Sequence, residues 1–160
     1  MKSEVLTADP EIRFSEPVEL ILREKGRGVW SISPDATVYD AIQMMSDKHV
    51  GALLVVAHGS LVGIVSERDY ARKVILKGKQ SQQTPVREIM TSPVLYVTPE
   101  HSVDECMHLM TSRAVRHLPV LDGETVAGVI SIVDLVEWVI RGHKHMIHQL
   151  ENYIAGAYPA

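Results

Sequence analysis

Short aliphatic runs alternate along this chain with segments whose apolar residues follow helical spacing. Residues 53–56 (LLVV) and 61–65 (LVGIV) are two such runs, joined by a polar turn, and this pattern is typical of a β-hairpin. A stripe with the period of an amphipathic helix precedes the hairpin at Val38, Ala41, Ile42 and Met45. The pattern therefore predicts a short strand over 29–33, a helix, the hairpin, and a second helix from Ser66.

The whole pattern occurs twice. A shift of 65 residues lays Val29–Ile75 over Val94–Ile140 without a gap. The second copy predicts a strand over 94–98, a helix, strands over 118–121 and 126–130, and a second helix from Ser131. One such unit leaves an apolar sheet face uncovered, so two neighbouring copies should pack together. The predicted fold class is α/β, with two β-α-β-β-α repeats packed around a pseudo-two-fold axis.

The repeat also divides the chain into segments. We expect an N-terminal tail (1–15), a first repeat (16–80), a second repeat (81–141) and a C-terminal helical extension (142–160). Thr37 and Ser102 should cap the first helix of each repeat, because an acidic residue follows each of them at the third position. The polar stretch 77–92 connects the repeats, and its apolar residues are expected to pack back onto them: Val86, Ile89 and Met90.

Composition narrows the functional classes. Hydrophobic residues make up 46% of the 160 residues and charged residues 22%, which is typical of a globular protein. The net charge is −4 and no basic run occurs, which argues against nucleic acid as a partner. No apolar stretch is long enough for a membrane span and the N-terminus lacks the pattern of a signal peptide. The sequence therefore predicts a cytoplasmic protein without a membrane partner.

One polar motif is shared by the copies, Gly-x-x-Ser-x-x-Asp, at Gly63–Asp69 and Gly128–Asp134. Both stand where a strand turns into a helix, and free N–H groups and the helix dipole at such a point favour a phosphate. The serine can donate to phosphate, the aspartate can accept from ribose hydroxyls, and the glycine would let a flat ring approach the backbone. The alternative is purely structural, because Ser-x-x-Asp is also a helix cap.

At these residues the chain resembles a tandem pair of CBS domains, often called a Bateman module. The resemblance covers about residues 16 to 141 and is strongest over GIVSERDYARKVILKGKQS and MTSRAVRHLPVLDG. It is similar to small stand-alone bacterial proteins regarded as candidates for signal transduction. In the family the motif is Gly, a hydrophobic residue, any residue, Ser or Thr, two residues, then Asp or Asn. Both copies satisfy it.

The resemblance implies roles for particular residues. Asp69 and Asp134 would hold ribose hydroxyls, and Ser66 and Ser131 would contact sugar or phosphate. Residues at the start of each repeat would help enclose adenine: Ser33, Thr37, Thr98 and Ser102. Strand openings would supply backbone contacts and walls: Ala52, His117, Leu118 and Pro119. The ligands implied are AMP first, with NAD(H), ADP, ATP or S-adenosylmethionine as further members of the class.

Differences between the copies indicate that the two sites are unequal. After the motif serine the first copy has Glu67-Arg68 and later Arg72, whereas the second copy has Ile132-Val133 and Glu137. Before its hairpin the second copy has Arg116-His117 where the first has Gly51-Ala52. We expect these cations to face one central cleft and bind phosphates, since arginine suits forked recognition: Arg68, Arg72, Arg116 and His117. The alternative for Arg72, and for Lys73 beside it, is solvated surface charge.

The sequence favours a non-catalytic regulatory module that senses adenine nucleotides and acts on an unidentified protein. The alternative is a ligand-free structural or dimerisation module. An enzyme would need a carboxylate cluster or a nucleophile–base pair, and neither is found. The lone Cys106 lies on an apolar stripe, as a core residue would, and the histidines at 143, 145 and 148 lack a completing ligand for metal. A homodimer is expected through helix faces carrying Met44, Met45, Leu109 and Met110.

Overall fold

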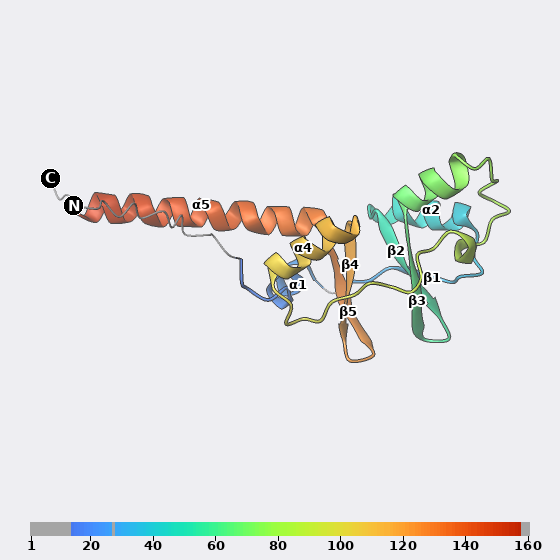
Figure 1. Cartoon of the computed structure of the whole chain (residues 1–160), viewed down its shortest axis with the longest axis horizontal. Coiled ribbons are helices and arrows are strands. Elements are labelled where there is room, and N and C mark those ends of the chain that lie inside the picture. The colour runs from blue at the N-terminus through green and yellow to red at the C-terminus, as the bar shows by residue number, and fades with distance from the viewer. Residues whose placement is uncertain (1–13, 27, 158–160) are drawn as a thin grey trace, which may run out of the picture.

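The computed structural model describes residues 14–26 and 28–157. Its elements follow the duplicated order (Figure 1), and their bounds are α1 (Glu19–Lys25), β1 (Ser31–Ile32), α2 (Val38–Lys48), β2 (Ala52–Ala57), β3 (Ser60–Ser66), α3 (Glu67–Tyr70), a π-helical turn (Ala71–Ile75), a 3₁₀ turn (Val86–Glu88), α4 (Val103–Arg113), β4 (His117–Asp122), β5 (Thr125–Ser131) and α5 (Ile132–Ala157). The α/β class and the two repeats are confirmed. Of the expected tail, residues 1–13 lie outside the described part, as do residues 158–160 of the expected extension.

The two hairpins are built alike and lie side by side (Figure 1). In β2–β3, Ala52 pairs with Ser66, and in β4–β5, His117 pairs with Ser131. Both ladders shift register at the same place, after Val55 in the first copy and at Val120 in the second. The two hairpins therefore have the same strand pairing, including the same register shift.

The strand expected over 94–98 is an element that the second copy does not repeat. In the first copy, the N–H of Leu54 donates to the carbonyl of Trp30 at 3.1 Å, and β1 forms beside β2. The residue equivalent to Leu54 is Pro119, which has no N–H to donate. Only a single bridge between Val97 and Val120 remains there. The prediction of a second edge strand is wrong for this reason.

The helix caps agree with the sequence. The Thr37 hydroxyl accepts from the N–H of Asp40 at 3.1 Å, and the Ser102 hydroxyl accepts from the N–H of Glu105 at 3.1 Å. Each cap residue also forms a backbone bridge to a proline in a segment that precedes a repeat. Thr37 bridges to Pro85, which precedes the second repeat, and Ser102 bridges to Pro17, which precedes the first. The start of each repeat is thereby fixed in the same way.

We call the segment before each repeat its leading segment: α1 lies in the first and the 3₁₀ turn in the second. Each leading segment packs on the other repeat. Val18 and Leu22 are fully buried in the core of the second copy, and Val86 and Ile89 are buried in the core of the first. Packing of the connection onto the repeats is thus confirmed, and Phe14, at the end of the expected tail, is buried as well. This exchange ties the copies together across the pseudo-two-fold axis.

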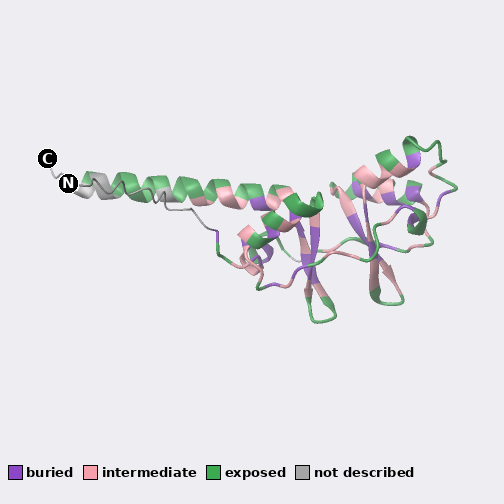
Figure 2. Ribbon diagram, viewed as in Figure 1, coloured by how far each residue is buried: buried purple, intermediate pink, exposed green. Residues whose placement is uncertain are grey.

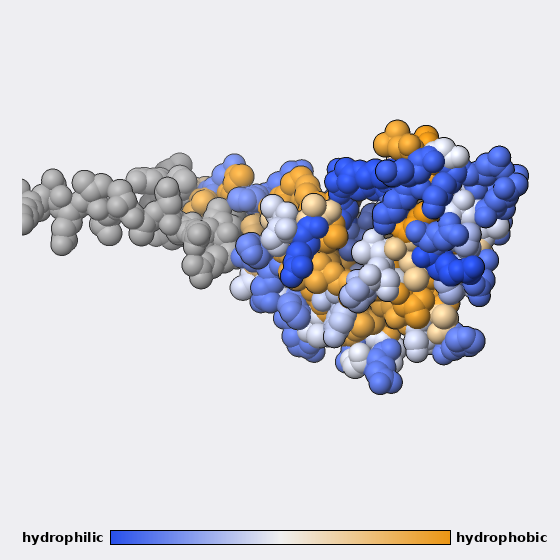
Figure 3. Space-filling model, turned by 45° about the vertical axis from the view of Figure 1, so that its right-hand side comes forward, coloured by the Kyte–Doolittle hydropathy of each residue, from blue (hydrophilic) through white to orange (hydrophobic). Residues whose placement is uncertain are grey.

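The helix faces expected to mediate dimerisation are partly taken up by the cores of their own repeats. Met45 and Met110 are 1% and 3% exposed, so these two belong to the cores. Met44 and Leu109 are half-buried, and for them the expected interface stays a prediction. Large apolar side chains reach the surface elsewhere. Apolar surface is visible on both copies (Figure 3), and five exposed apolar residues belong to α5, whose outer part is exposed (Figure 2).

The two motif glycines accommodate the leading segments rather than an open space. A Cβ built on Gly63 would lie 2.6 Å from Sδ of Met90, and one on Gly128 would lie 2.6 Å from Cδ2 of Leu22. The expectation that these glycines admit a flat ligand ring is wrong, because the chain's own side chains fill that space. Glycine is required here for close packing between segments.

Gly128→Ala should therefore destabilise the protein. Leu22 is fully buried, so its side chain must shift within the core to admit the added Cβ. This overpacking should lower the free energy of unfolding by about 1–3 kcal/mol. The measurement is urea unfolding followed by circular dichroism. Gly28→Ala is the matched control, since no described atom lies within 4 Å of its added Cβ, and it should change stability by less than about 0.5 kcal/mol. Equal losses in both variants would contradict the packing role.

Candidate functional site

The first motif lies at the junction of β3 and α3 and forms a reciprocal cap. The N–H of Asp69 donates to the Ser66 hydroxyl at 3.2 Å, and the N–H of Ser66 donates to Oδ2 of Asp69 at 3.0 Å. The ammonium of Lys73, one turn further on, lies 3.0 Å from Oδ1 of Asp69. The structural interpretation of this motif as a helix cap is therefore confirmed, and any ligand role is additional to it.

Beside this motif lies a cavity of about 320 Å³ between the two repeats. It lies between the start of α3 in one copy and the start of β4 in the other. Six of the residues predicted for the site line it: Ser66, Arg68, Asp69, Arg72, Arg116 and His117. The cations expected from the differences between the copies thus come together in one place.

Charge at this cavity is predominantly positive. Besides the predicted residues, Lys73 and Glu67 line the cavity, so four arginine and lysine side chains face two carboxylates. Arg68 also spans the copies, because its Nη1 donates to the carbonyl of Ala114 at 3.0 Å. Such a wall suits an anionic ligand.

The second motif has the same cap and a different environment. The N–H of Ser131 donates to Oδ2 of Asp134 at 2.8 Å, and the N–H of Asp134 donates to the Ser131 hydroxyl at 3.2 Å. Here Lys25 of α1 provides the cation, with its Nζ 2.7 Å from Asp134 Oδ2 and 2.9 Å from the carbonyl of Val129. The carboxylate therefore already holds an ammonium from outside its own repeat.

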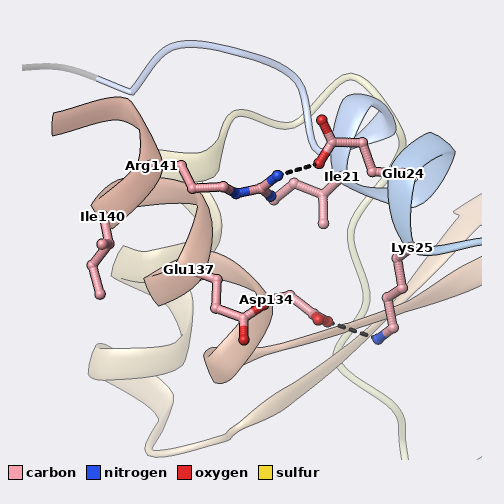
Figure 4. Close-up of a pocket in the computed structure, with 7 residues that line it drawn as sticks. All are labelled: Ile21, Glu24, Lys25, Asp134, Glu137, Ile140 and Arg141. Carbon is pink, nitrogen blue, oxygen red and sulfur yellow. Dashed lines mark hydrogen bonds and ion pairs between the residues drawn. The ribbon is translucent and has the colours of Figure 1, made fainter. Parts of the chain in front are cut away.

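The pocket around Lys25 and Asp134 has no excess of positive charge (Figure 4). Glu24 and Glu137 line it together with Arg141, whose Nη1 donates to Oε2 of Glu24 at 2.8 Å. Two cations thus stand beside three carboxylates. The two copies present the same motif in opposite electrostatic surroundings.

The other predicted site residues do not line the cavity at the first motif, and several have local roles. The Ser33 hydroxyl accepts from the N–H of Asp35 at 3.2 Å, and the Thr98 hydroxyl lies 2.9 Å from Nδ1 of His101. The remaining ones are the cap residues Thr37 and Ser102, the half-buried strand residue Ala52, and the buried Leu118 and Pro119.

Sequence reasoning missed Lys25, the cation that pairs with Asp134. It counted Lys73 among the cations of the first copy without predicting that Lys73 pairs with Asp69, four residues before it. For Lys25 the available signal is a second repeat, Pro-Val-x-x-Ile, at Pro17–Ile21 and Pro85–Ile89. Its spacing differs from that of the main repeat, so one gapless shift does not reveal it.

Burial changes the protonation of two groups. It lowers the pKa of His117 below the ordinary 6.5, Lys25 and Arg116 lower it further, and Asp134 opposes them. Burial together with the neighbouring Glu105 raises the pKa of the Cys106 thiol to about 12. Cys106 is fully buried and protonated at neutral pH, so its expected core position is confirmed.

Metal ligands and membrane-spanning helices are two further features that the sequence raised. Within residues 14–26 and 28–157, no three potential ligands from His, Cys, Asp and Glu gather as a metal would need. The histidines considered as metal ligands, at 143, 145 and 148, are exposed residues of α5. The Nε2 of His145 lies 2.9 Å from the Gln149 amide. Over the same range, no helix has the length and apolarity to cross a membrane.

The duplicated fold and its motifs define a tandem module with an inter-repeat cavity. The CBS domain profile matches residues 26–75 and 86–141, and the chain belongs to this family. A mitochondrial CBS domain-containing protein of Arabidopsis thaliana is 40% identical, over 90% of this chain and 74% of the relative.

Solved structures of CBS-domain proteins have the same fold. A candidate signal-transduction protein with CBS domains from Burkholderia ambifaria has a TM-score of 0.76 and 52% identity, covering 78% of this chain and 94% of that one. A hexameric CBS-domain protein from bloom-forming cyanobacteria has a TM-score of 0.69 and 28% identity, covering 88% and 87%. The resemblance stated from the motifs is confirmed.

The pKa of His117 should make stability depend on pH. The unfolded chain takes up a proton near the ordinary histidine pKa, whereas folded His117 does so only at lower pH. Stability should therefore fall as the pH drops below about 6.5, because protons bind the unfolded state first. Thermal unfolding at about pH 7.5 and 5.5 measures this.

The variant His117→Asn should lose less stability than wild type over this pH interval. His108→Asn is the matched control, since His108 is exposed on α4, and it should retain the wild-type fall. An unchanged fall in His117→Asn would show that other groups set the pH dependence.

Proposed function

We propose that this chain is a non-catalytic regulatory module that senses an adenine nucleotide in the cavity beside the first motif. The observation that carries the proposal is the gathering of Asp69, Arg72, Arg116 and His117 around one cavity between the repeats. Its volume of about 320 Å³ lies in the range of small-molecule sites. AMP is the favoured ligand, with ADP, ATP and NAD(H) as further candidates.

The first motif has the groups that such a ligand needs. A carboxylate offers about four acceptor positions, and three at Asp69 are taken by Ser66 N–H, Ser66 Oγ and Lys73. One position remains for a ribose hydroxyl. Arg72 and Arg116 have exposed side chains beside it for phosphate. The chain's own residues thus fit a nucleotide without rearrangement of the cap.

The second motif is proposed to bind more weakly. Its aspartate holds Lys25, and its pocket has more carboxylates than cations. A phosphate placed there would meet Glu24 and Glu137 where the first motif offers arginines. We infer two unequal sites, of which the first is the sensor.

The alternative function is a ligand-free structural or dimerisation module. The observation that favours it is that both motif aspartates already have a cation from the same chain, Lys73 and Lys25. In either case the proposed partners are a second copy and an unidentified protein, and the proposed location is the cytoplasm. Neither function requires a catalytic group.

Binding measured by isothermal titration should distinguish the two motifs. Asp69→Asn should weaken AMP binding about tenfold to a hundredfold, since a hydrogen bond to a charged group contributes about 1.5–3 kcal/mol. Asp134→Asn is the matched control and should bind as wild type does. Arg116→Ala should weaken ADP more than adenosine, because it removes only a phosphate contact.

Wild-type protein without binding heat or thermal shift for AMP, ADP, ATP and NAD(H) would favour the ligand-free alternative. Loss of binding in Asp134→Asn, with Asp69→Asn unaffected, would move the sensor to the second motif.

Removing the Lys25 ammonium should expose the second motif. Lys25→Met keeps the aliphatic stem and frees Asp134 for a ribose. Adenosine has no phosphate to meet Glu24 and Glu137, so the number of adenosine molecules bound per chain should rise from one to two. Arg23→Met, on the same helix with a side chain that is 68% exposed, is the control and should leave it at one. The measurement is equilibrium dialysis with labelled adenosine. A ratio that stays at one in Lys25→Met would show that another feature closes the second motif.

A further inference from the structure

The outer part of α5 extends away from both repeats (Figure 1). Its described side chains from His143 onward are exposed (Figure 2). An isolated helical segment as short as this outer part, about 15 residues, is marginal in water without tertiary packing. A continuous helix from Ile132 to Ala157 therefore calls for a contact that covers one of its faces.

The exposed apolar residues of α5 form a heptad seam. Five large ones are 46–60% exposed, at Val133, Val136, Ile140, Ile147 and Leu150. Their spacings alternate between three and four residues once His143 takes the remaining position, so they occupy positions a and d of a heptad. This is the pattern of a helix that pairs with another helix.

The other faces of the first half of α5 already have neighbours. Position b faces α1, where Asp134 pairs with Lys25 and Arg141 with Glu24. Positions c and g face the core through the fully buried Leu135 and through Ile132 and Val139. The open face therefore consists of the five exposed apolar residues and the adjoining e positions, which are Glu137, Lys144 and Glu151. The ring of His143 contacts the Phe14 ring edge-on.

Charge on this open flank determines the orientation of a partner helix. In a parallel pair, e residues face g residues, which here include the apolar Ile132 and Val139 and would leave Glu137 and Lys144 without opposite charges. In an antiparallel pair, e faces e, so Glu137 can meet a lysine. Among the described residues neither Glu137 nor Lys144 has an ion-pair partner. Complementary e charges are what sets partner and orientation.

We propose that the α5 seam pairs antiparallel with α5 of a second copy of this chain, with the two-fold axis between Arg141 and Gly142. In this register Val133 meets the partner's Leu150, and Val136 meets the partner's Ile147. Glu137 lies beside the partner's Lys144, twice by symmetry. All five exposed seam residues are then covered, and the proposal goes beyond nucleotide sensing.

Charge reversal tests the register in the full chain. Sedimentation equilibrium should show a dimer for wild type. Glu137→Lys or Lys144→Glu alone should raise the dissociation constant about tenfold or more, because each places like charges together twice. The double variant should return it to near the wild-type value, and Glu151→Lys, on the same flank, is the control that should leave it unchanged.

Cysteine pairing tests the orientation independently of charge. On oxidation, a mixture of Val133→Cys and Leu150→Cys chains should form a disulfide-linked heterodimer, whereas Leu150→Cys alone should not cross-link. Cys106 is buried and stays out of the reaction. A monomeric wild type would overturn the proposal, as would a dimer that is insensitive to Glu137→Lys and Lys144→Glu. Cross-linking of Leu150→Cys with itself would overturn it by indicating a parallel pair.

Discussion

The arrangement of the whole molecule depends on the contact of each leading segment with a motif glycine of the opposite repeat. Leu22 lies against Gly128 and Met90 lies against Gly63. A Cβ at either position would overlap these side chains. Because glycine has none, the segments can lie flat across the sheets. The end of each segment then reaches a motif: Lys25 contacts Asp134, and Thr91 pairs with Ile64 through two backbone hydrogen bonds of 2.8 and 3.1 Å.

This exchange makes the two motifs chemically different although their backbones match. At the second motif the leading segment brings an ammonium, which satisfies the aspartate. At the first motif it brings only backbone groups, so Lys73 from the same helix supplies the charge and the arginines remain available. The duplication thus provides one geometry, and the sequence differences decide which copy can receive an anion.

Local features could be predicted from sequence because they depend on neighbouring residues. The hairpins and the Thr37 and Ser102 caps are set within a few residues, and pseudo-symmetry brought Arg72 and Arg116 to one cavity because it places one copy's helix opposite the other's hairpin. The misses depend on long-range contacts. Lys25 and Asp134 are 109 residues apart, and the missing edge strand depends on the absent N–H of Pro119 against a distant segment.

The second motif shares a helix with the apolar seam, because its Asp134 lies on α5. Asp134 and Arg141 lie on α5 and hold α1 through two ion pairs, Lys25 to Asp134 and Arg141 to Glu24. Such partly exposed pairs each contribute at most about 1 kcal/mol, so an anion that competes for Lys25 can break the pair with Asp134 while the buried Leu22 keeps α1 in place. Leu135 remains buried in the core, so α5 itself keeps its place. The seam lies on the same helix, so a change at Asp134 alters the flank of α5 next to the seam. The first motif lies on β3 and α3 and shares no element with the seam.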